Sequence, residues 1–270
     1  MSNELAMKSE NALADIPMNI DDMAADAALG GKVGLADIGI PFLTILQGNS
    51  PQVNSDSPKY IDGAKTGMIY VTVLEKILEA RANALEVVPC FYERVINEWV
   101  PREQGGGLTG SHSVDDLENI MDQAEPNERG QMFLANGHQL IDTAYWYLLL
   151  NLSGTWKQCV MPFKSTHMKT SRRWNSQLST TYIPGTQKVA PRWLYRWKLK
   201  TIKEQRDQFV WSSPVVEIGE IVSKNIYDVA KDYAKIAAGG ILRRKILAAE
   251  NKAAQEGIVD GSKLEDEVPF

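Results

Sequence analysis

The chain has 270 residues, of which 44% are hydrophobic and 23% charged, and its formal net charge is −5. This length allows one large domain or two small ones, and the composition is that of an ordinary globular protein. No run approaches the ~20 apolar residues of a membrane span, residues 1–20 lack the pattern of a signal peptide, and two lone cysteines indicate reduced thiols. We therefore expect a cytoplasmic protein without a membrane partner.

Residues 1–37 are predicted to form an acidic, flexible N-terminal arm, because residues 1–40 hold seven acids and only two lysines. Order is expected from residue 38 onward. The alternation over residues 68–74 predicts a strand, and residues 74–83 a short helix or a loop. Residues 85–100 predict a long strand with a bend or bulge near Pro89.

A long connection follows over residues 101–138, with a glycine run and an acidic patch. Connections of this length are usually functional or disordered. Beyond it, the patterns predict strands over 140–152, 156–163, 192–202 and 208–218, and helices over 164–178, 220–238 and 241–255. On the first of these helices one face carries Met168, Ser171, Trp174 and Leu178.

From residue 85 the order is strand, long connection, strand, tight turn, strand, helix, strand, short turn, strand. This is the order of an OB-fold, a five-stranded barrel with a helix between its third and fourth strands. We therefore predict an α+β chain: an OB-fold-like antiparallel β-barrel over residues 38–218 with insertion 101–138, an additional N-terminal strand or strands, and C-terminal helices over 219–255. An α+β domain of another topology is the alternative.

Basic and aromatic residues are concentrated between Trp156 and Trp211. This segment holds five of the seven tryptophans, twelve Lys or Arg and two acids, a formal +10 within an acidic chain. Single-stranded nucleic acid offers phosphates for the cations and bases for the rings. The alternative is that the tryptophans are core residues and the charges a solvated strand face.

A strand over residues 192–200 would place charged residues on one face and Trp193 and Trp197 on the other. We expect phosphate contacts from the charged face and base stacking from aromatic residues in polar surroundings. The predicted nucleic-acid-binding residues are Trp156, Lys169, Arg172, Arg173, Trp174, Tyr182, Arg192, Arg196, Lys198, Lys200 and Trp211.

No catalytic constellation is recognisable. His112, His138 and His167 are scattered without metal-ligand spacing, and we interpret them as structural or solvated. The acids of residues 115–122 fall in a loop-like segment without flanking strands to hold a metal site. We expect no catalysed reaction, no metal and no cofactor.

Residues 256–270 are predicted to form an acidic tail, which ends in Glu265, Asp266, Glu267, Val268, Pro269 and Phe270. This ending resembles the C-terminal tip of the bacterial single-stranded DNA-binding protein (SSB) family, a run of acids followed by Ile-Pro-Phe, with Val268 in place of Ile. The resemblance implies that the tip docks on replication and repair proteins and competes with DNA for the binding groove. The alternative is a solvated acidic end.

The body of the chain does not match the bacterial family. Residues 42–51 and 98–112 resemble bacteriophage proteins from replication regions, which implies a phage-encoded protein of the host cytoplasm. Together these patterns predict a single-stranded DNA-binding protein of replication or recombination that binds largely independently of sequence and recruits partners through its tail. A structural or assembly protein of a virus particle, or a nuclease, are the alternatives, and DNA against RNA preference and homo-oligomer formation stay open.

Overall fold

The computed structural model describes residues 26, 38–101, 104–128 and 130–255. The chain divides into two units, residues 1–39 and 40–270, and the account below concerns the second. Most of the predicted N-terminal arm and the whole predicted acidic tail, residues 256–270, lie outside the described residues. No helix among the described residues is both long and apolar enough to span a membrane.

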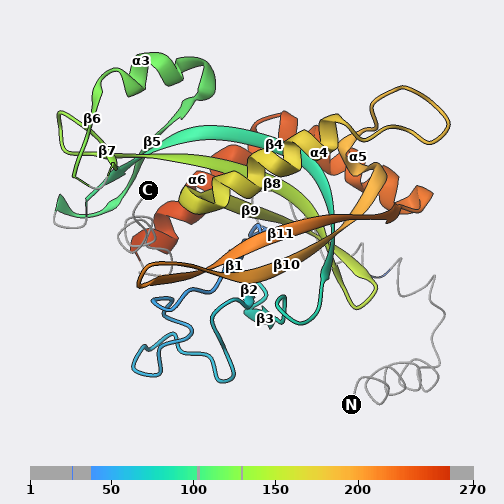
Figure 1. Cartoon of the computed structure of the whole chain (residues 1–270), viewed down its shortest axis with the longest axis horizontal. Helices are drawn as coiled ribbons and strands as arrows, with labels where there is room; N and C mark the ends of the chain where they lie inside the picture. The colour runs from blue at the N-terminus through green and yellow to red at the C-terminus, as the bar shows by residue number, and fades with distance from the viewer. Residues whose placement is uncertain (1–25, 27–37, 102–103, 129, 256–270) are drawn as a thin grey trace. The chain divides into compact units, whose positions relative to one another are not determined.

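Five long antiparallel strands form the main sheet: β4 (Leu85–Val100), β8 (Gln139–Leu152), β9 (Thr155–Lys164), β10 (Tyr195–Arg206) and β11 (Phe209–Ile221). They lie in the spatial order β11-β10-β4-β8-β9, because β10 returns to pair with the free side of β4. The predicted α+β class is confirmed, and the long strands and the helix between β9 and β10 occur in the predicted order (Figure 1).

The strand pairs leave this sheet open, so the predicted barrel is not closed by hydrogen-bonded strands within the described residues. A small sheet of β1 (Leu43–Ile45), β2 (Ile69–Val71) and β3 (Lys76–Leu78) contacts both free edges. The Val160 N–H on β9 donates to the Pro41 carbonyl at 2.9 Å, which ties the small sheet to one edge.

The other free edge belongs to β11. The Gln47 side chain exchanges two hydrogen bonds with the backbone of Ser212 there, at 2.9 and 2.8 Å. The small sheet also corrects one prediction. Residues 76–78 form strand β3 rather than a helix or a loop, because a turn with Glu75 at φ 49° folds them back onto β2.

The bend predicted near Pro89 is confirmed. The pairing of β4 with β8 shifts register between Pro89 and Phe91. Proline has no N–H to donate to a ladder, so a bulge is where a strand can accommodate it.

The predicted long connection contains regular secondary structure, and the interpretation of its acidic part as a loop-like segment without flanking strands is wrong. It forms β5 (Gly107–Ser113), a 3₁₀ turn (Val114–Asp116), α3 (Leu117–Met121), β6 (Ala124–Pro126) and β7 (Met132–Leu134). β5 pairs with β4 and β7 with β8, so the segment, here called the insertion, extends the main sheet.

Two histidines hold the insertion on β4. The carboxylate of Glu98 is hydrogen-bonded to His112 Nε2 at 3.0 Å and to His138 Nδ1 at 2.5 Å. Burial alone would raise the pKa of Glu98, but the hydrogen bonds from His138 and His112 outweigh it and leave this pKa below its ordinary value. The structural interpretation of these two histidines therefore agrees with their contacts.

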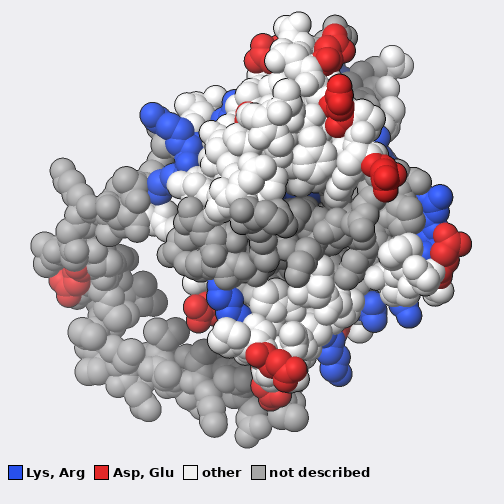
Figure 2. Space-filling model, turned by 90° about the vertical axis from the view of Figure 1, so that its left-hand side faces the viewer, with Lys and Arg blue, Asp and Glu red and all other residues white. Residues whose placement is uncertain are grey.

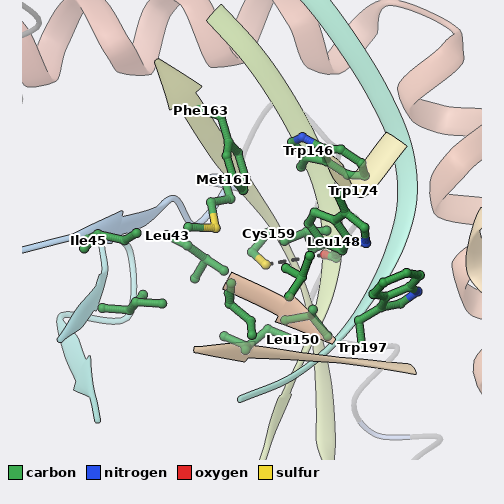
Figure 3. Close-up of a cluster of buried hydrophobic side chains, with 14 of the residues drawn as sticks. Leu43, Ile45, Trp146, Leu148, Leu150, Cys159, Met161, Phe163, Trp174 and Trp197 are labelled. Carbon is green, nitrogen blue, oxygen red and sulfur yellow. Dashed lines mark hydrogen bonds between the residues drawn. The ribbon is translucent and has the colours of Figure 1, made fainter. Parts of the chain in front are cut away.

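One face of the sheet is covered by α4 (Met168–Ser179). Its buried residues are Met168, Ser171, Trp174 and Leu178, the face that the sequence predicted. Trp174 stacks on Trp146 of β8, with ring centroids 4.1 Å apart and planes at 12°, and Trp197 of β10 lies beside them (Figure 3). Trp146 Nε1 also donates to Ser171 Oγ at 2.9 Å, so ring packing and one hydrogen bond fix α4 against the sheet.

The opposite face is covered by α5 (Lys224–Ala238) and α6 (Ile241–Gln255). Beneath α6 lies an ion pair, Lys164 Nζ to Glu250 Oε1 at 2.8 Å, whose side chains are only 8% and 4% exposed. The second carboxylate oxygen of Glu250 accepts from the Tyr145 hydroxyl and, at 3.2 Å, from Asn97 Nδ2. Because both faces of the sheet are covered, the middle of β8 is buried on both sides.

Candidate nucleic-acid interface

A cleft of about 510 Å³ opens where the insertion, the end of the main sheet, the start of α4 and the tip of the β10–β11 hairpin meet. Apolar side chains make up much of its wall. Its lining residues are Ile96, Met121, Gly130, Gln131, Met132, Leu140, Asp142, Ser165, Thr166, Met168, Lys169, Arg172, Glu204 and Trp211. An apolar cleft with a few convergent polar groups is the usual form of a binding site.

The start of α4 supplies the cations of the cleft. A 3₁₀ turn (Ser165–His167) leads directly into the helix, and no side chain caps either the turn or the helix. Lys169 and Arg172 follow on the first turns of α4 and line the cleft. The Arg172 side chain is 69% exposed, and its contact in the described structure is a long one, 3.9 Å to Asp142.

Both carboxylates of the cleft already have donors. Asp142 receives a two-pronged bond from Arg94, at 2.8 Å from Nε and 2.6 Å from Nη2. Glu204 Oε2 accepts from the Trp211 indole N–H at 2.9 Å and from the Ser213 hydroxyl. The bonded carboxylates leave Lys169 and Arg172 as the charges most available to an incoming ligand.

The structure brings three of the predicted binding residues together: Lys169, Arg172 and Trp211 all line the cleft. Trp211 is half-buried, and its indole N–H is held by Glu204, which fixes the orientation of the ring. Arg173, the neighbour of Arg172 on α4, is exposed but is not part of the lining.

The prediction that Trp174 stacks on a base is wrong for this conformation. Its ring is fully buried between Trp146, Phe163 and Trp197, so no base can reach either face. The sequence already placed Trp174 on the apolar face of its helix, and that signal outweighs the polar character of its chain neighbours.

Arg192 was predicted to face phosphate from a strand, but residues 192–194 form a 3₁₀ turn before β10 begins. Its guanidinium donates to Asn175 Oδ1 at 2.8 Å and lies 5.5 Å and 5.7 Å from the rings of Tyr92 and Trp146. Burial lowers the pKa of Arg192, although nearby Tyr92 raises it. Arg192 therefore packs against the aromatic core and is not free to bind phosphate.

Arg196, Lys198 and Lys200 project from the face of β10 opposite the buried Trp197 and Leu199, which agrees with the predicted alternation. Acidic side chains of the neighbouring strands lie among them. Arg196 is 3.6 Å from Glu86, Lys200 is 3.9 Å from Glu217, and Lys198 pairs in register with both acids. These contacts reduce the positive field expected from the sequence.

The remaining two predicted residues lie elsewhere and do not line the cleft. Trp156, on β9, packs partly against the core on the α5 side. Tyr182 is exposed in the loop after α4, where it forms an isolated bridge with Val189 and its carbonyl accepts from the Tyr195 hydroxyl. The predicted set is thus divided between the cleft, the core, the outer face of β10 and this loop.

Figure 2 shows how charge is distributed on one face of the molecule. Red carboxylates gather toward the top, where Figure 1 places α3, and blue side chains lie lower and to either side. Asp115, Asp116 and Asp122 are exposed in that segment. The described residues contain no group of three or more His, Cys, Asp or Glu arranged to hold a metal ion.

Sequence reasoning missed two features of this region. Gln131 lies within the wall of the cleft, and Glu98 with its two histidines anchors the insertion beside it. No sequence motif marks either feature, because both arise only when the insertion folds back onto the sheet.

Comparison with known proteins identifies one relationship. No curated protein and no solved structure matches the chain. Residues 8–242, most of the chain, match the family described as Pam3 phage gp34-like protein, in agreement with the phage origin expected from the sequence. The chain therefore belongs to the Pam3 phage gp34-like protein family.

Proposed function

We propose that this phage-family protein binds single-stranded DNA, and that the cleft between the insertion and the β10–β11 hairpin takes part of the strand. The observation that carries the proposal is the convergence of Lys169, Arg172 and Trp211 on one cleft. Two cations and a fixed indole ring supply the phosphate contacts and the stacking surface that sequence-independent binding uses.

The topology also supports this function. The strands lie in the order β10-β4-β8-β9, in which the fourth strand returns beside the first, as in a Greek key. A partly open Greek-key barrel with a helix after its third strand is the OB-fold arrangement, whose first and last loops flank the ligand. Here the insertion and the β10–β11 hairpin hold those two positions.

The cleft is the better candidate than the outer surface of β8 and β9. OB-folds commonly bind oligonucleotides on the second and third strands. Helices α5 and α6 cover that surface here, with Tyr145 and Tyr147 buried beneath them. A ligand that approaches the described residues therefore meets the cleft rather than the face of the sheet.

Fluorescence anisotropy with a labelled single-stranded oligonucleotide tests the proposal. Two phosphate contacts should contribute about −1.4 to the slope of log K against log salt, at about −0.7 per phosphate for a single strand. Lys169→Ala with Arg172→Ala should remove that contribution. The matched control is Lys224→Ala with Lys231→Ala on α5, across the sheet, which should leave the slope unchanged. Absence of binding by the wild-type chain at low salt would refute the proposal.

A second candidate, an assembly protein of a virus particle, is favoured by one observation. β11 lies at an edge of the main sheet, and Val210, Ile218 and Ile221 on this strand are exposed. An exposed apolar edge strand favours pairing with another chain. Under this alternative the protein sediments as a concentration-dependent oligomer, and Ile218→Lys abolishes the oligomer without affecting the anisotropy signal.

A further inference from the structure

The first residues of β11 place a second aromatic ring beside Trp211. Phe209 lies two positions before Trp211, so the two side chains project from the same face of the strand, with their Cα atoms about 7 Å apart. In the pairing of β10 with β11, Trp211 is opposite Glu204 and Phe209 is opposite Arg206. Trp211 lines the cleft, and Phe209 therefore continues the same face toward the tip of the hairpin.

These two rings are not part of the core. Phe209 and Trp211 are only partly buried, and among the described residues neither packs against the two clusters of buried hydrophobic side chains. Trp174, in contrast, is fully buried and packs on three other aromatic rings. Large aromatic side chains dominate the energetics of cores and of interfaces alike. Two neighbouring rings that lie outside the core and are partly open to solvent therefore indicate an interface.

The surroundings of the two rings favour a single strand of nucleic acid as the partner. The exposed Arg206 pairs in register with the second ring, and Lys169 and Arg172 line the cleft together with the first. The indole N–H of Trp211 donates to Glu204 at 2.9 Å, which fixes the orientation of that ring. Cations meet the phosphates of such a strand, and its successive bases stack on flat rings.

We infer that Phe209 and Trp211 form a stacking platform for two neighbouring bases of a single strand, with one base on Trp211 at the cleft and the other on Phe209 at the hairpin tip. The inference rests on the proposed function and extends its site from the cleft onto the face of the β10–β11 hairpin. Arg206 is the cation placed to contact the phosphate beside the second base. Phe209 is thus a base-binding residue in its own right, beyond the cleft lining.

Fluorescence anisotropy with a labelled oligothymidylate tests the platform. Phe209→Ala should weaken binding by about fivefold or more, the lower end of what the loss of one stacked base costs. Phe209→Trp, which keeps a flat ring, should bind at least as tightly as the wild type, whereas Phe209→Leu, which keeps only apolar volume, should weaken binding as Phe209→Ala does. The matched control is Val210→Ala, which should leave affinity unchanged, because Val210 lies between the two rings in sequence, is 44% exposed and points to the opposite face. Thermal unfolding of each variant verifies that it is folded.

Two further measurements show whether Phe209 itself stacks on a base. An abasic strand of the same length keeps the phosphates and lacks the bases, so wild-type and Phe209→Ala chains should bind it equally. In a Trp211→Ala background, Phe209→Ala should still weaken oligothymidylate binding by about fivefold or more. If it caused no additional loss there, Phe209 would act only through Trp211, and the platform would be wrong.

The outcomes separate the platform from the proposed function. If the wild type binds oligothymidylate and Phe209→Ala behaves as Val210→Ala does, the platform is overturned and the proposed function stands. The same holds if Phe209→Ala weakens binding of the abasic strand as much as that of oligothymidylate. Absence of binding by the wild type at low salt refutes the proposed function and the inference with it. If Phe209→Ala unfolds, Phe209→Leu replaces it, and wild-type affinity in that variant overturns the inference.

Discussion

The ion pair beneath α6 provides a quantitative test of how the C-terminal helices are held. Lys164 and Glu250 are 2.8 Å apart and almost entirely removed from water. Replacement of Glu250 by Leu leaves the Lys164 ammonium buried without its counter-charge, and such a change costs about 3–5 kcal/mol. We expect Glu250→Leu to lower the free energy of unfolding by about that amount, measured by urea denaturation with tryptophan fluorescence.

The double variant isolates the interaction. Lys164→Met with Glu250→Leu removes both charges, so the main penalty that remains is the lost acceptor of the Tyr145 hydroxyl, about 1–3 kcal/mol. The double variant should therefore be more stable than either single variant. Lys224→Met with Asp228→Leu, an exposed pair on α5, is the control and should change stability by less than about 1 kcal/mol. A double variant whose loss equals the sum of the two single losses would refute the buried pair.

Four further predictions concern the core, the cleft, the insertion and the tail. Trp174→Ala should lower the free energy of unfolding by about 3–5 kcal/mol, because its ring fills the core. Trp211→Ala should leave the free energy of unfolding nearly unchanged but weaken oligonucleotide binding by about 1–3 kcal/mol in anisotropy titrations. If Trp174→Ala and Trp211→Ala lowered the free energy of unfolding by similar amounts, the assignment of Trp174 to the core and Trp211 to the cleft would be wrong. Because the pKa of Glu98 is lowered in the folded protein, its stabilisation is present above the ordinary value of 4.5 and is lost as pH falls through the folded-state pKa. Glu98→Gln should therefore reduce the loss of unfolding free energy that the wild type shows as pH falls below 4.5. If the variant lost as much stability at low pH as the wild type, ionised Glu98 would not stabilise the fold. Deletion of Leu264–Phe270 should modestly raise apparent DNA affinity at low salt and abolish capture of replication proteins from host extract, whereas equal affinity with an unchanged set of captured proteins would make the resemblance accidental.

The periodicity of apolar residues along the sequence predicted several of the long strands and helices correctly. The bounds of β4 and α6 are those expected, and the buried face of α4 is the expected one, because periodicity records which residues meet the core. The same reasoning applied to residues 76–78 failed. Three residues are too few to show a period, and their strand character depends on β2 beside them.

The candidate site was predictable only in part. Lys169 and Arg172 could be placed beside the apolar face of α4 from spacing alone, and they do line the cleft. The acids that surround Lys198 and Lys200 could not, because Glu86 comes from a strand more than a hundred positions earlier in the chain. Net charge over a segment of sequence therefore overstated the positive field at its surface.

The position of β4 has a consequence for synthesis of the chain. Three strands pair with β4: β5 follows it directly in the sequence, whereas β8 and β10 come later. At ribosomal rates of about 5–20 residues per second, β10 follows about a hundred residues after β4, a delay of roughly 5–20 s. During that interval residues 85–87 of β4, which pair with β10, lack their partner on that side. Non-local pairing of this kind slows folding. We therefore expect a chaperone that binds the nascent chain before β10 is made to raise the yield of folded protein.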